Sequence, residues 1–310
     1  MNLKKLHYTL YIYTRTFLTL AVDRQRRYSA YRKLSRQSAP FIISIEADGV
    51  GLFAQLFWCI VIWNHYSEKG LPIPTIRCTS ANYAGTNGDW LAHISDSKQS
   101  APPPRASIKI RRFEHLPFFM EGSGITLKRA TELVRTHLPI SPRIQSQVQS
   151  FVEKHFGGKV VLGVHYRGTD KHLEAQRIPH LEFLEQIEKH VEAIGAQVVF
   201  VATDEEPFAK AVSSFFMNRT HVVMLEHSRS TNADPIHQRM GGGVEPQTLA
   251  EEALVDCLIL SKCQRLLKTP SMLSGWAKIF NPDLEVCMIG ELHANRIFFP
   301  DSQLSSKNLS

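Results

Sequence analysis

Residues 159–171 read KVVLGVHYRGTDK, and this stretch decides the fold. Five apolar residues at 160–164 pass directly into histidine, arginine, aspartate and lysine side chains. The apolar run predicts a buried strand at 159–165. The polar residues after it therefore lie in a loop at the carboxyl end of that strand.

Strands and helices alternate after this first strand, with short connections. We expect strands at 197–202, 221–225, 265–268 and 284–289, and helices at 180–194, 207–217, 248–261 and 271–280. The helix at 248–261 has Thr248 and Glu251 in the spacing of a capping box. This alternation predicts a mainly parallel, doubly wound sheet. Ligands of such sheets bind beyond the carboxyl ends of the strands, where the strand order reverses.

The first half of the chain is also predicted to be α/β. We expect strands at 41–45, 73–78 and 107–111, and helices at 49–66, 126–138 and 141–157. Gly157-Gly158 is the expected boundary between an N-terminal lobe at 39–157 and a C-terminal lobe at 158–300. A basic arm at 1–38 precedes the two lobes, and a tail at 301–310 follows them.

The basic charge belongs to the arm. The chain of 310 residues has a net charge of +7, yet residues 1–40 hold nine Lys or Arg and a single acid, Asp23. A nucleic-acid-binding protein more often spreads its basic residues over a face of the fold. We therefore expect no nucleic-acid partner.

The arm is also amphipathic, because apolar residues recur every three or four positions between Leu3 and Leu20. Three interpretations stay open. The first is that the arm docks peripherally on an anionic membrane surface. The second is that it is an organelle-targeting segment. The third is that it packs on the body of the protein or on a partner subunit.

Five cysteines in an unpaired pattern, several of them in apolar runs, are typical of buried free thiols and not of a disulfide framework or a metal site. No stretch has the roughly 20 apolar residues that a membrane span needs. We therefore expect a cytoplasmic protein in a reducing compartment, with the arm as its candidate contact with a membrane.

Three strand ends carry candidate ligand-binding residues. The loop at 165–171 offers an arginine and a lysine, the side chains that bind phosphate oxygens, although its charges could also pair with each other. Asp204 follows the second strand and could bind sugar or ribose hydroxyls, or cap the next helix together with Glu205. Thr269 and Ser271 follow another strand, where hydroxyls and backbone N–H groups at a helix start can bind phosphate or simply cap the helix.

These motifs resemble those of the GDP-fucose-dependent fucosyltransferase superfamily, which includes α-1,6-, nodulation and protein O-fucosyltransferases. Residues 165–171 resemble its H-x-R-x-x-D motif, 201–204 its second motif and 267–271 its third. The Gly-rich start of the helix at 49–56 resembles an N-terminal motif of the same enzymes. The resemblance spans about 130 residues of the second half.

The resemblance implies a GT-B-like fold of two Rossmann-like lobes, with GDP-fucose in the second lobe and the acceptor side in the first. It implies an inverting transfer to a glycan, glycolipid or protein hydroxyl, with no metal or other cofactor. The catalytic residues would be Arg167, Glu174 as the base, and Asp170. The donor-binding residues would be His165, Arg167, Lys171, Asp204, Asp256, Thr269 and Ser271, with His165 and Asp256 near the guanine and Ser271 on the phosphate.

Two departures from the family pattern leave alternatives open. Gly168 stands where many α-1,6 enzymes have a second arginine, and Glu174 lies one residue closer to the lysine. A glycosyltransferase with another nucleotide sugar, or an inactive nucleotide- or glycan-binding protein, is therefore also compatible with the sequence. No P-loop, complete dinucleotide fingerprint or nucleophile elbow occurs, so ATP and NAD enzymes and α/β-hydrolases fit poorly.

Overall fold

The computed structural model describes residues 25, 29, 41–85, 88–96, 107–116, 124–168, 175, 177–227, 229–231, 245–291 and 299–304. Gln25 and Ser29 are helical and exposed. The rest of the predicted arm at 1–38 lies outside the described residues, as do Asp170, Lys171 and Glu174.

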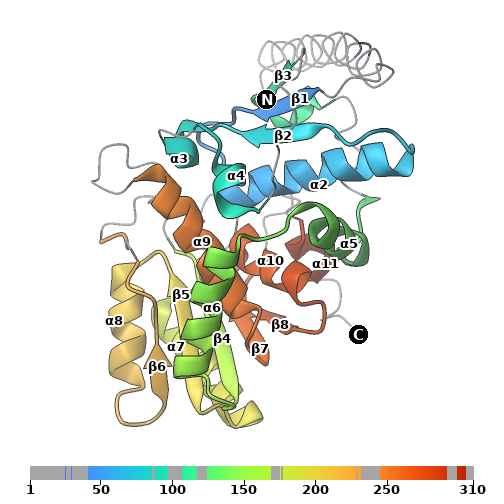
Figure 1. The fold of residues 1–310 in the computed structure, drawn as a ribbon. Helices are drawn as coiled ribbons and strands as arrows, with labels where there is room; N and C mark the ends of the chain where they lie inside the picture. The colour runs from blue at the N-terminus through green and yellow to red at the C-terminus, as the bar shows by residue number, and fades with distance from the viewer. Residues whose placement is uncertain are drawn as a thin grey trace, which may run out of the picture.

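Two parallel sheets form the framework of the molecule (Figure 1). The smaller sheet has the order β2-β1-β3, from β1 (Ile42–Ile45), β2 (Thr75–Cys78) and β3 (Ser107–Ile110). The larger sheet has the order β6-β5-β4-β7-β8, from β4 (Val161–Tyr166), β5 (Val198–Thr203), β6 (His221–Val223), β7 (Arg265–Lys268) and β8 (Glu285–Met288). The chain moves outward from β4 to β6 and then returns to the other side of β4, so the strand order reverses between β4 and β7.

Alternation along the strands of the larger sheet gives it two apolar faces. Leu162, Val164 and Tyr166 of β4 pack with α7 (His180–Ile194) and α8 (Glu206–Phe215). The opposite face packs against α6 (Pro142–His155), α9 (Pro246–Leu260) and α10 (Met272–Phe280). The two-lobed α/β architecture predicted from the sequence is therefore present, with a doubly wound second lobe.

The remaining helices belong to the N-terminal lobe or join the two lobes. They are α2 (Leu52–Glu68), α3 (Ala81–Ala84), α4 (Trp90–Ile94), the 3-10 turn η2 (Phe113–His115), α5 (Leu127–His137) and α11 (Asp301–Leu304). Helix α2 packs on α5 and α10, while α3 and α4 contact α9. Phe53 of α2 meets Trp276 of α10 with ring centroids 5.7 Å apart. One apolar core therefore continues from the first lobe into the second.

Three sequence-based expectations about boundaries are corrected. Helix α6, assigned to the N-terminal lobe, packs on the larger sheet through Phe151, whose ring lies 5.5 Å from that of Phe200. Helix α9 begins at Pro246, so Thr248 lies inside the helix and does not cap it. Asp301, placed in a tail, begins helix α11 and is fully buried.

The contacts of Glu251 explain why the capping box expected from Thr248 and Glu251 does not form. Its carboxylate accepts a hydrogen bond from Arg143 of α6 and pairs with His93 of α4, at 3.2 Å. The hydrogen bond from Arg143 lowers the pKa of Glu251. The residue that completed the capping-box pattern therefore joins three helices instead.

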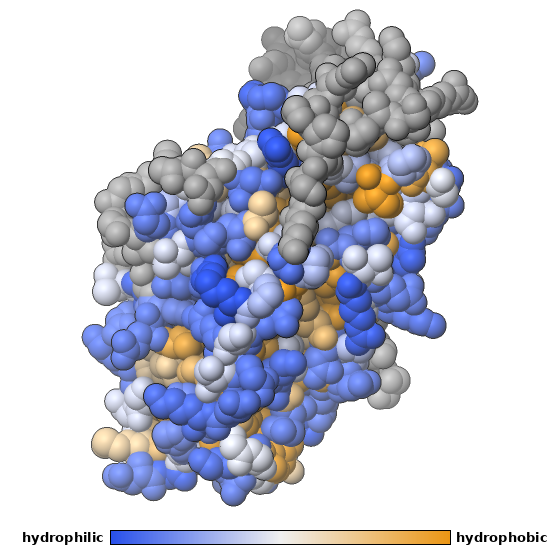
Figure 2. All heavy atoms as spheres, in the orientation of Figure 1, coloured by the Kyte–Doolittle hydropathy of each residue, from blue (hydrophilic) through white to orange (hydrophobic). Residues whose placement is uncertain are grey.

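The described part of the surface in Figure 2 is largely hydrophilic, and its apolar side chains lie in small groups. Among the described residues, no helix combines the length and the apolar composition needed to cross a bilayer. All five cysteines are free thiols, and four of them are buried, as the sequence predicts.

Candidate functional site

The end of β4 places His165 and Arg167 on the same side of the sheet. Side chains two positions apart on a strand share a face, and this face is the one that α9 covers. Tyr166 points to the opposite face, where it stacks on Phe208 at 4.2 Å between ring centroids. The buried Tyr166 thus anchors the strand end while its two neighbours reach the α9 side.

Arg167 is held by the ends of the two neighbouring strands. Its backbone N–H donates to the Thr269 hydroxyl at 2.9 Å, and its guanidinium lies 3.6 Å from the Asp204 carboxylate. The Arg167 side chain is 21% exposed, so it is accessible although largely shielded. These contacts bring together residues from β4, β5 and β7 that the sequence assigned to one site.

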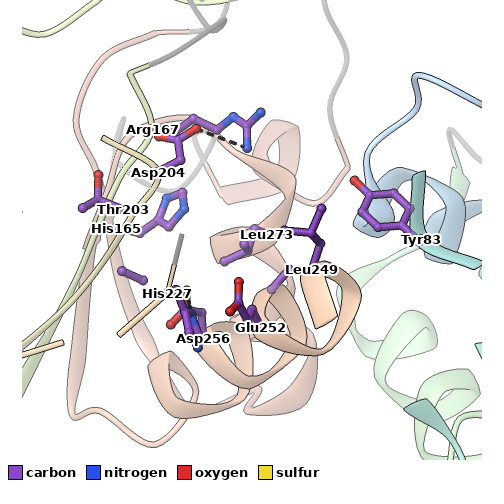
Figure 3. Close-up of a pocket in the computed structure, with 12 residues that line it drawn as sticks. Tyr83, His165, Arg167, Thr203, Asp204, His227, Leu249, Glu252, Asp256 and Leu273 are labelled. Atoms are coloured by element: carbon purple, nitrogen blue, oxygen red, sulfur yellow. Dashed lines mark hydrogen bonds and ion pairs between the residues drawn. The ribbon is translucent and has the colours of Figure 1, made fainter. Parts of the chain in front are cut away.

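A pocket opens on this side of the sheet, between the strand ends and α9 (Figure 3). Tyr83 contributes to its wall from the N-terminal lobe, across from Arg167 and Asp204. The other lining residues are His165, Ala202, Thr203, His227, Leu249, Glu252, Ala253, Asp256 and Leu273. The pocket therefore lies where the two lobes meet and where the strand order reverses.

Asp256 and His227 form a pair in the wall of this pocket. The Asp256 Oδ2 atom lies 3.2 Å from His227 Nδ1. Burial is the largest single influence and lowers the pKa of His227, but the hydrogen bond to Asp256 and the negative charges of Asp256 and Glu252 together outweigh it, so the pKa of His227 is raised. The other carboxylate oxygen, Asp256 Oδ1, is buried and accepts no hydrogen bond from any described residue. It is thus an oxygen of a pocket-lining residue whose hydrogen-bonding capacity no described residue uses.

Sequence reasoning did not identify Tyr83, His227 or Glu252. Glu252 precedes Asp256 by one helical turn on α9, so the position of Asp256 could have indicated it. Tyr83 lies in the short helix α3 of the other lobe, and His227 follows the edge strand β6. No sequence pattern marks either position.

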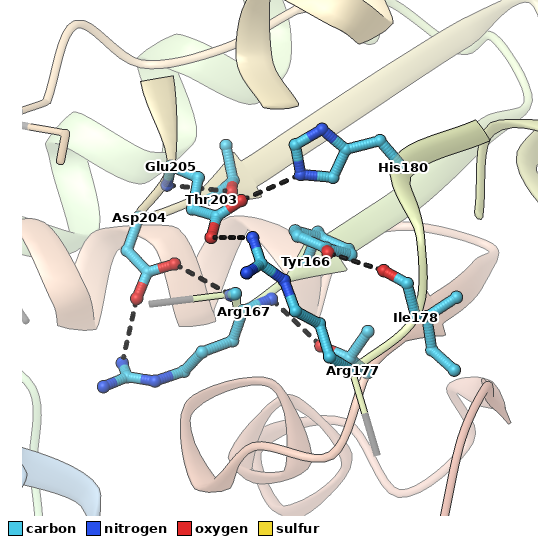
Figure 4. Close-up of polar contacts among 10 residues, drawn as sticks. Tyr166, Arg167, Arg177, Ile178, His180, Thr203, Asp204 and Glu205 are labelled. Atoms are coloured by element: carbon cyan, nitrogen blue, oxygen red, sulfur yellow. Dashed lines mark hydrogen bonds and ion pairs between the residues drawn. The ribbon is translucent and has the colours of Figure 1, made fainter. Parts of the chain in front are cut away.

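Glu205 has a different role from the helix cap that the sequence suggested. It occupies the N-cap position of α8, but its side chain makes no capping hydrogen bond with the described residues. The buried carboxylate instead pairs with His180 at 2.9 Å and with Arg177 at 3.3 Å (Figure 4). It thereby fixes the chain before α7 against the end of β5.

The same carboxylate explains Gly168. A Cβ atom at this position would lie 2.2 Å from Glu205 Oε1. Since Arg177 and His180 hold that carboxylate, it cannot move without breaking their contacts. An arginine at this position, with its larger side chain, would therefore collide with Glu205 in the same way.

We expect Gly168→Ala to lower the free energy of unfolding by about 1–3 kcal/mol, the usual cost of overpacking a filled site. Chemical denaturation of the variant measures this change. Gly124→Ala is the matched control, because a Cβ there would meet none of the described residues within 4 Å. Equal stabilities of the two variants would contradict the assigned position of the Glu205 carboxylate.

Neither Ser271 nor Thr269, both predicted to bind the donor, is among the residues that line this pocket. The Thr269 N–H donates to the carbonyl of His165 at 3.0 Å. The Ser271 N–H donates to Asp301 Oδ2 at 2.7 Å. The expectation of free backbone N–H groups at this helix start is therefore corrected for Ser271. The hydroxyl of Ser271 is buried and makes no capping bond with the described residues.

Among the described residues, no three or more histidine, cysteine or acidic side chains gather as a metal site would require. The base candidate Glu174 and its neighbours Asp170 and Lys171 lie outside the described residues. Their roles stay predictions from the sequence.

Comparison with known proteins finds similarity among solved structures alone. No family model and no curated protein matches the chain. The fucosyltransferase NodZ from Bradyrhizobium shares 14% identity at a TM-score of 0.46, over 79% of this chain and 94% of NodZ. POFUT1 in complex with GDP shares 11% at 0.48, over 82% and 99%. A mutant of Arabidopsis thaliana FUT1 in complex with GDP shares 10% at 0.46, over 84% and 73%. At these values, the assignment of function depends on the residues of the site.

Proposed function

We propose that this protein is an inverting glycosyltransferase that transfers a sugar, fucose, from a GDP-sugar donor to a hydroxyl group of a glycan, glycolipid or protein, without a metal ion. One observation carries the proposal. The Arg167 guanidinium and the Asp256 carboxylate line a single pocket at the strand-order reversal. The motif resemblance in residues 165–171, 201–204 and 267–271 agrees with it.

Arg167 supplies the positive charge that this reaction needs. The acceptor oxygen forms a bond to the anomeric carbon of the sugar while the bond from that carbon to the phosphate oxygen breaks. The electron pair leaves with GDP, so negative charge grows on the β-phosphate. The guanidinium is paired with Asp204, and the backbone N–H of the same residue is held by the Thr269 hydroxyl. Arg167 is therefore a fixed cation that stabilises this charge without reorganising. In this proposal it fills the role that a divalent metal has in other transferases.

Asp256 favours guanine among the nucleotide bases. A carboxylate only accepts hydrogen bonds. Guanine presents two adjacent donors, N1–H and the 2-amino group, whereas uracil presents a single N–H between two carbonyl oxygens that a carboxylate repels. With Oδ2 bound to His227, the unpaired Oδ1 is the acceptor for these donors. His165 lies on the same wall.

The acceptor proton must go to a base, for which Glu174 stays the candidate. A carboxylate within hydrogen-bond reach of the acceptor hydroxyl could remove its proton as the new bond forms. Tyr83 is the pocket residue from the N-terminal lobe, so we propose that the acceptor enters from that side. A cytoplasmic location fits the free thiols, and peripheral membrane contact through residues 1–38 remains a proposal from the sequence.

Calorimetric titration with GDP and with UDP, in the presence of a metal chelator, tests the nucleotide site. We expect GDP to bind with a dissociation constant in the micromolar range, about −8 kcal/mol, and UDP at least about tenfold more weakly. Preference for UDP would keep a glycosyltransferase but discard the guanine site. Binding of neither nucleotide would contradict the proposal.

Turnover separates an enzyme from an inactive binding protein. Incubation with GDP-fucose and a panel of hydroxyl acceptors is expected to release GDP and fucosylated product with inverted anomeric configuration, as NMR of the product can show. GDP binding without any release of GDP from GDP-fucose would favour an inactive nucleotide-binding homologue.

A further inference from the structure

Asp301 and Lys268 form an ion pair beneath the site that the proposed mechanism does not use. Both side chains are 0% exposed, and Lys268 Nζ lies 2.6 Å from Asp301 Oδ1. The second oxygen, Oδ2, accepts the Ser271 N–H at 2.7 Å. Both oxygens of one carboxylate therefore hold residues 268–271, the loop that joins β7 to α10.

That loop in turn holds the end of β4. Thr269 donates its N–H to the carbonyl of His165 and accepts the Arg167 N–H on its hydroxyl, at 3.0 and 2.9 Å. Arg167 is thus connected to Asp301 through its hydrogen bond to Thr269, the backbone of residues 269–271, and the hydrogen bond from the Ser271 N–H.

The segment that carries Asp301 also contacts the N-terminal lobe. Phe299 stacks on Phe57 of α2 with ring centroids 4.8 Å apart. The side chain of Gln303 accepts the Leu127 N–H at 3.1 Å and donates to the carbonyl of Ile125. Figure 1 shows α11 beside α10 and α5. Residues 299–304 therefore fix the loop at 268–271 relative to both lobes.

We propose that Asp301 is a positioning residue for the donor site, an inference that rests on the proposed function. It fixes the backbone of residues 268–271. Through Thr269, it also fixes the position of Arg167 in the pocket. A buried ion pair contributes little net stability, because desolvation offsets the attraction of the charges. The contacts of its two carboxylate oxygens do fix the loop. A displacement of about 1 Å in a ligand-binding site is enough to weaken the binding of the ligand.

Two double variants separate positioning from stability. Lys268→Met with Asp301→Asn removes both charges but keeps an amide oxygen that can accept the Ser271 N–H. Lys268→Met with Asp301→Leu removes the charges and the acceptor while keeping a similar volume. We expect the Asn variant to bind GDP within about threefold of the natural protein and the Leu variant about tenfold more weakly, which is about 1.4 kcal/mol.

Calorimetry with GDP and thermal unfolding are measured on the natural protein and on both variants. Equal GDP affinities of the two variants would overturn the positioning role while leaving the proposed function intact. If the natural protein itself binds no GDP, the proposed function fails and the inference fails with it. The two failures are therefore distinguishable.

Gly275→Ala gives a second test if a double variant does not fold. A Cβ at this position would lie 2.6 Å from Asp301 Oδ1 and 2.8 Å from the Pro300 side chain, so it displaces the segment while Lys268 and Ser271 stay unchanged. We expect GDP affinity to fall about tenfold, equal to about 1.4 kcal/mol. Natural affinity in the folded Gly275→Ala protein would overturn the proposal.

Discussion

Replacing Arg167 by alanine is expected to lower kcat/KM for the GDP-sugar donor by about 10³-fold, because a fixed cation stabilises charge that appears only in the transition state. GDP itself should bind more weakly by a smaller factor of about 10–100, since a charge-assisted hydrogen bond contributes about 1.5–3 kcal/mol. The two effects are separated by steady-state kinetics of donor turnover and by calorimetry with GDP. A larger loss in turnover than in binding is the signature of transition-state stabilisation.

Two further variants make this result specific. Arg167→Lys keeps the charge but loses the planar fork of donors, so an intermediate loss is expected. Arg219→Ala is the matched control, because it removes another arginine–carboxylate pair, with Glu188, in the same lobe but away from the pocket. If donor turnover and GDP binding both survive in Arg167→Ala, the proposed role of the β4 end is wrong.

The strands of the second lobe were predictable because their local patterns agree with their tertiary environment. β4, β5 and β7 are short apolar runs ended by polar residues, and each lies within two residues of its predicted bounds. The start of α9 was not predictable in the same way. Thr248 and Glu251 fit a capping box, but Glu251 is taken by contacts with α4 and α6 that no local pattern reveals.

The part of the candidate site that follows from the geometry of a parallel sheet was predictable. Arg167, Asp204 and Thr269 meet because parallel strands bring their carboxyl ends to one edge, and the structure places them in contact. The partners of these residues were not predictable. Asp301 reaches Lys268 across 33 positions, and His227 reaches Asp256 across 29. Contacts over such separations depend on the whole fold and leave no periodic signal.

The second large effect is expected at Asp256. In Asp256→Asn, the amide oxygen takes the place of Oδ2, where it accepts from the Nδ1–H tautomer of His227, whose Nδ1 lies 3.2 Å from Oδ2. The amide NH₂ group then replaces Oδ1 at the pocket. It would meet the N1–H and 2-amino donors of guanine donor to donor. We expect GDP affinity to fall about 100-fold, about 2.7 kcal/mol.

The same change should create affinity for a different base. Xanthine carries an oxygen in place of the 2-amino group, and this oxygen can accept from the NH₂ group of the asparagine. Asp256→Asn is therefore expected to bind xanthosine diphosphate better than GDP, whereas the natural protein has the opposite preference. Calorimetry with both nucleotides measures this change in nucleotide preference.

Glu226→Gln, which removes an exposed charge next to His227, is the control for a change in net charge alone. Loss of GDP binding without any gain in affinity for xanthosine diphosphate would show that Asp256 supports the pocket but does not contact the base. A reversal of the preference from GDP to xanthosine diphosphate requires direct contact between Asp256 and the nucleotide, because a general weakening of the pocket would lower the affinity for both nucleotides.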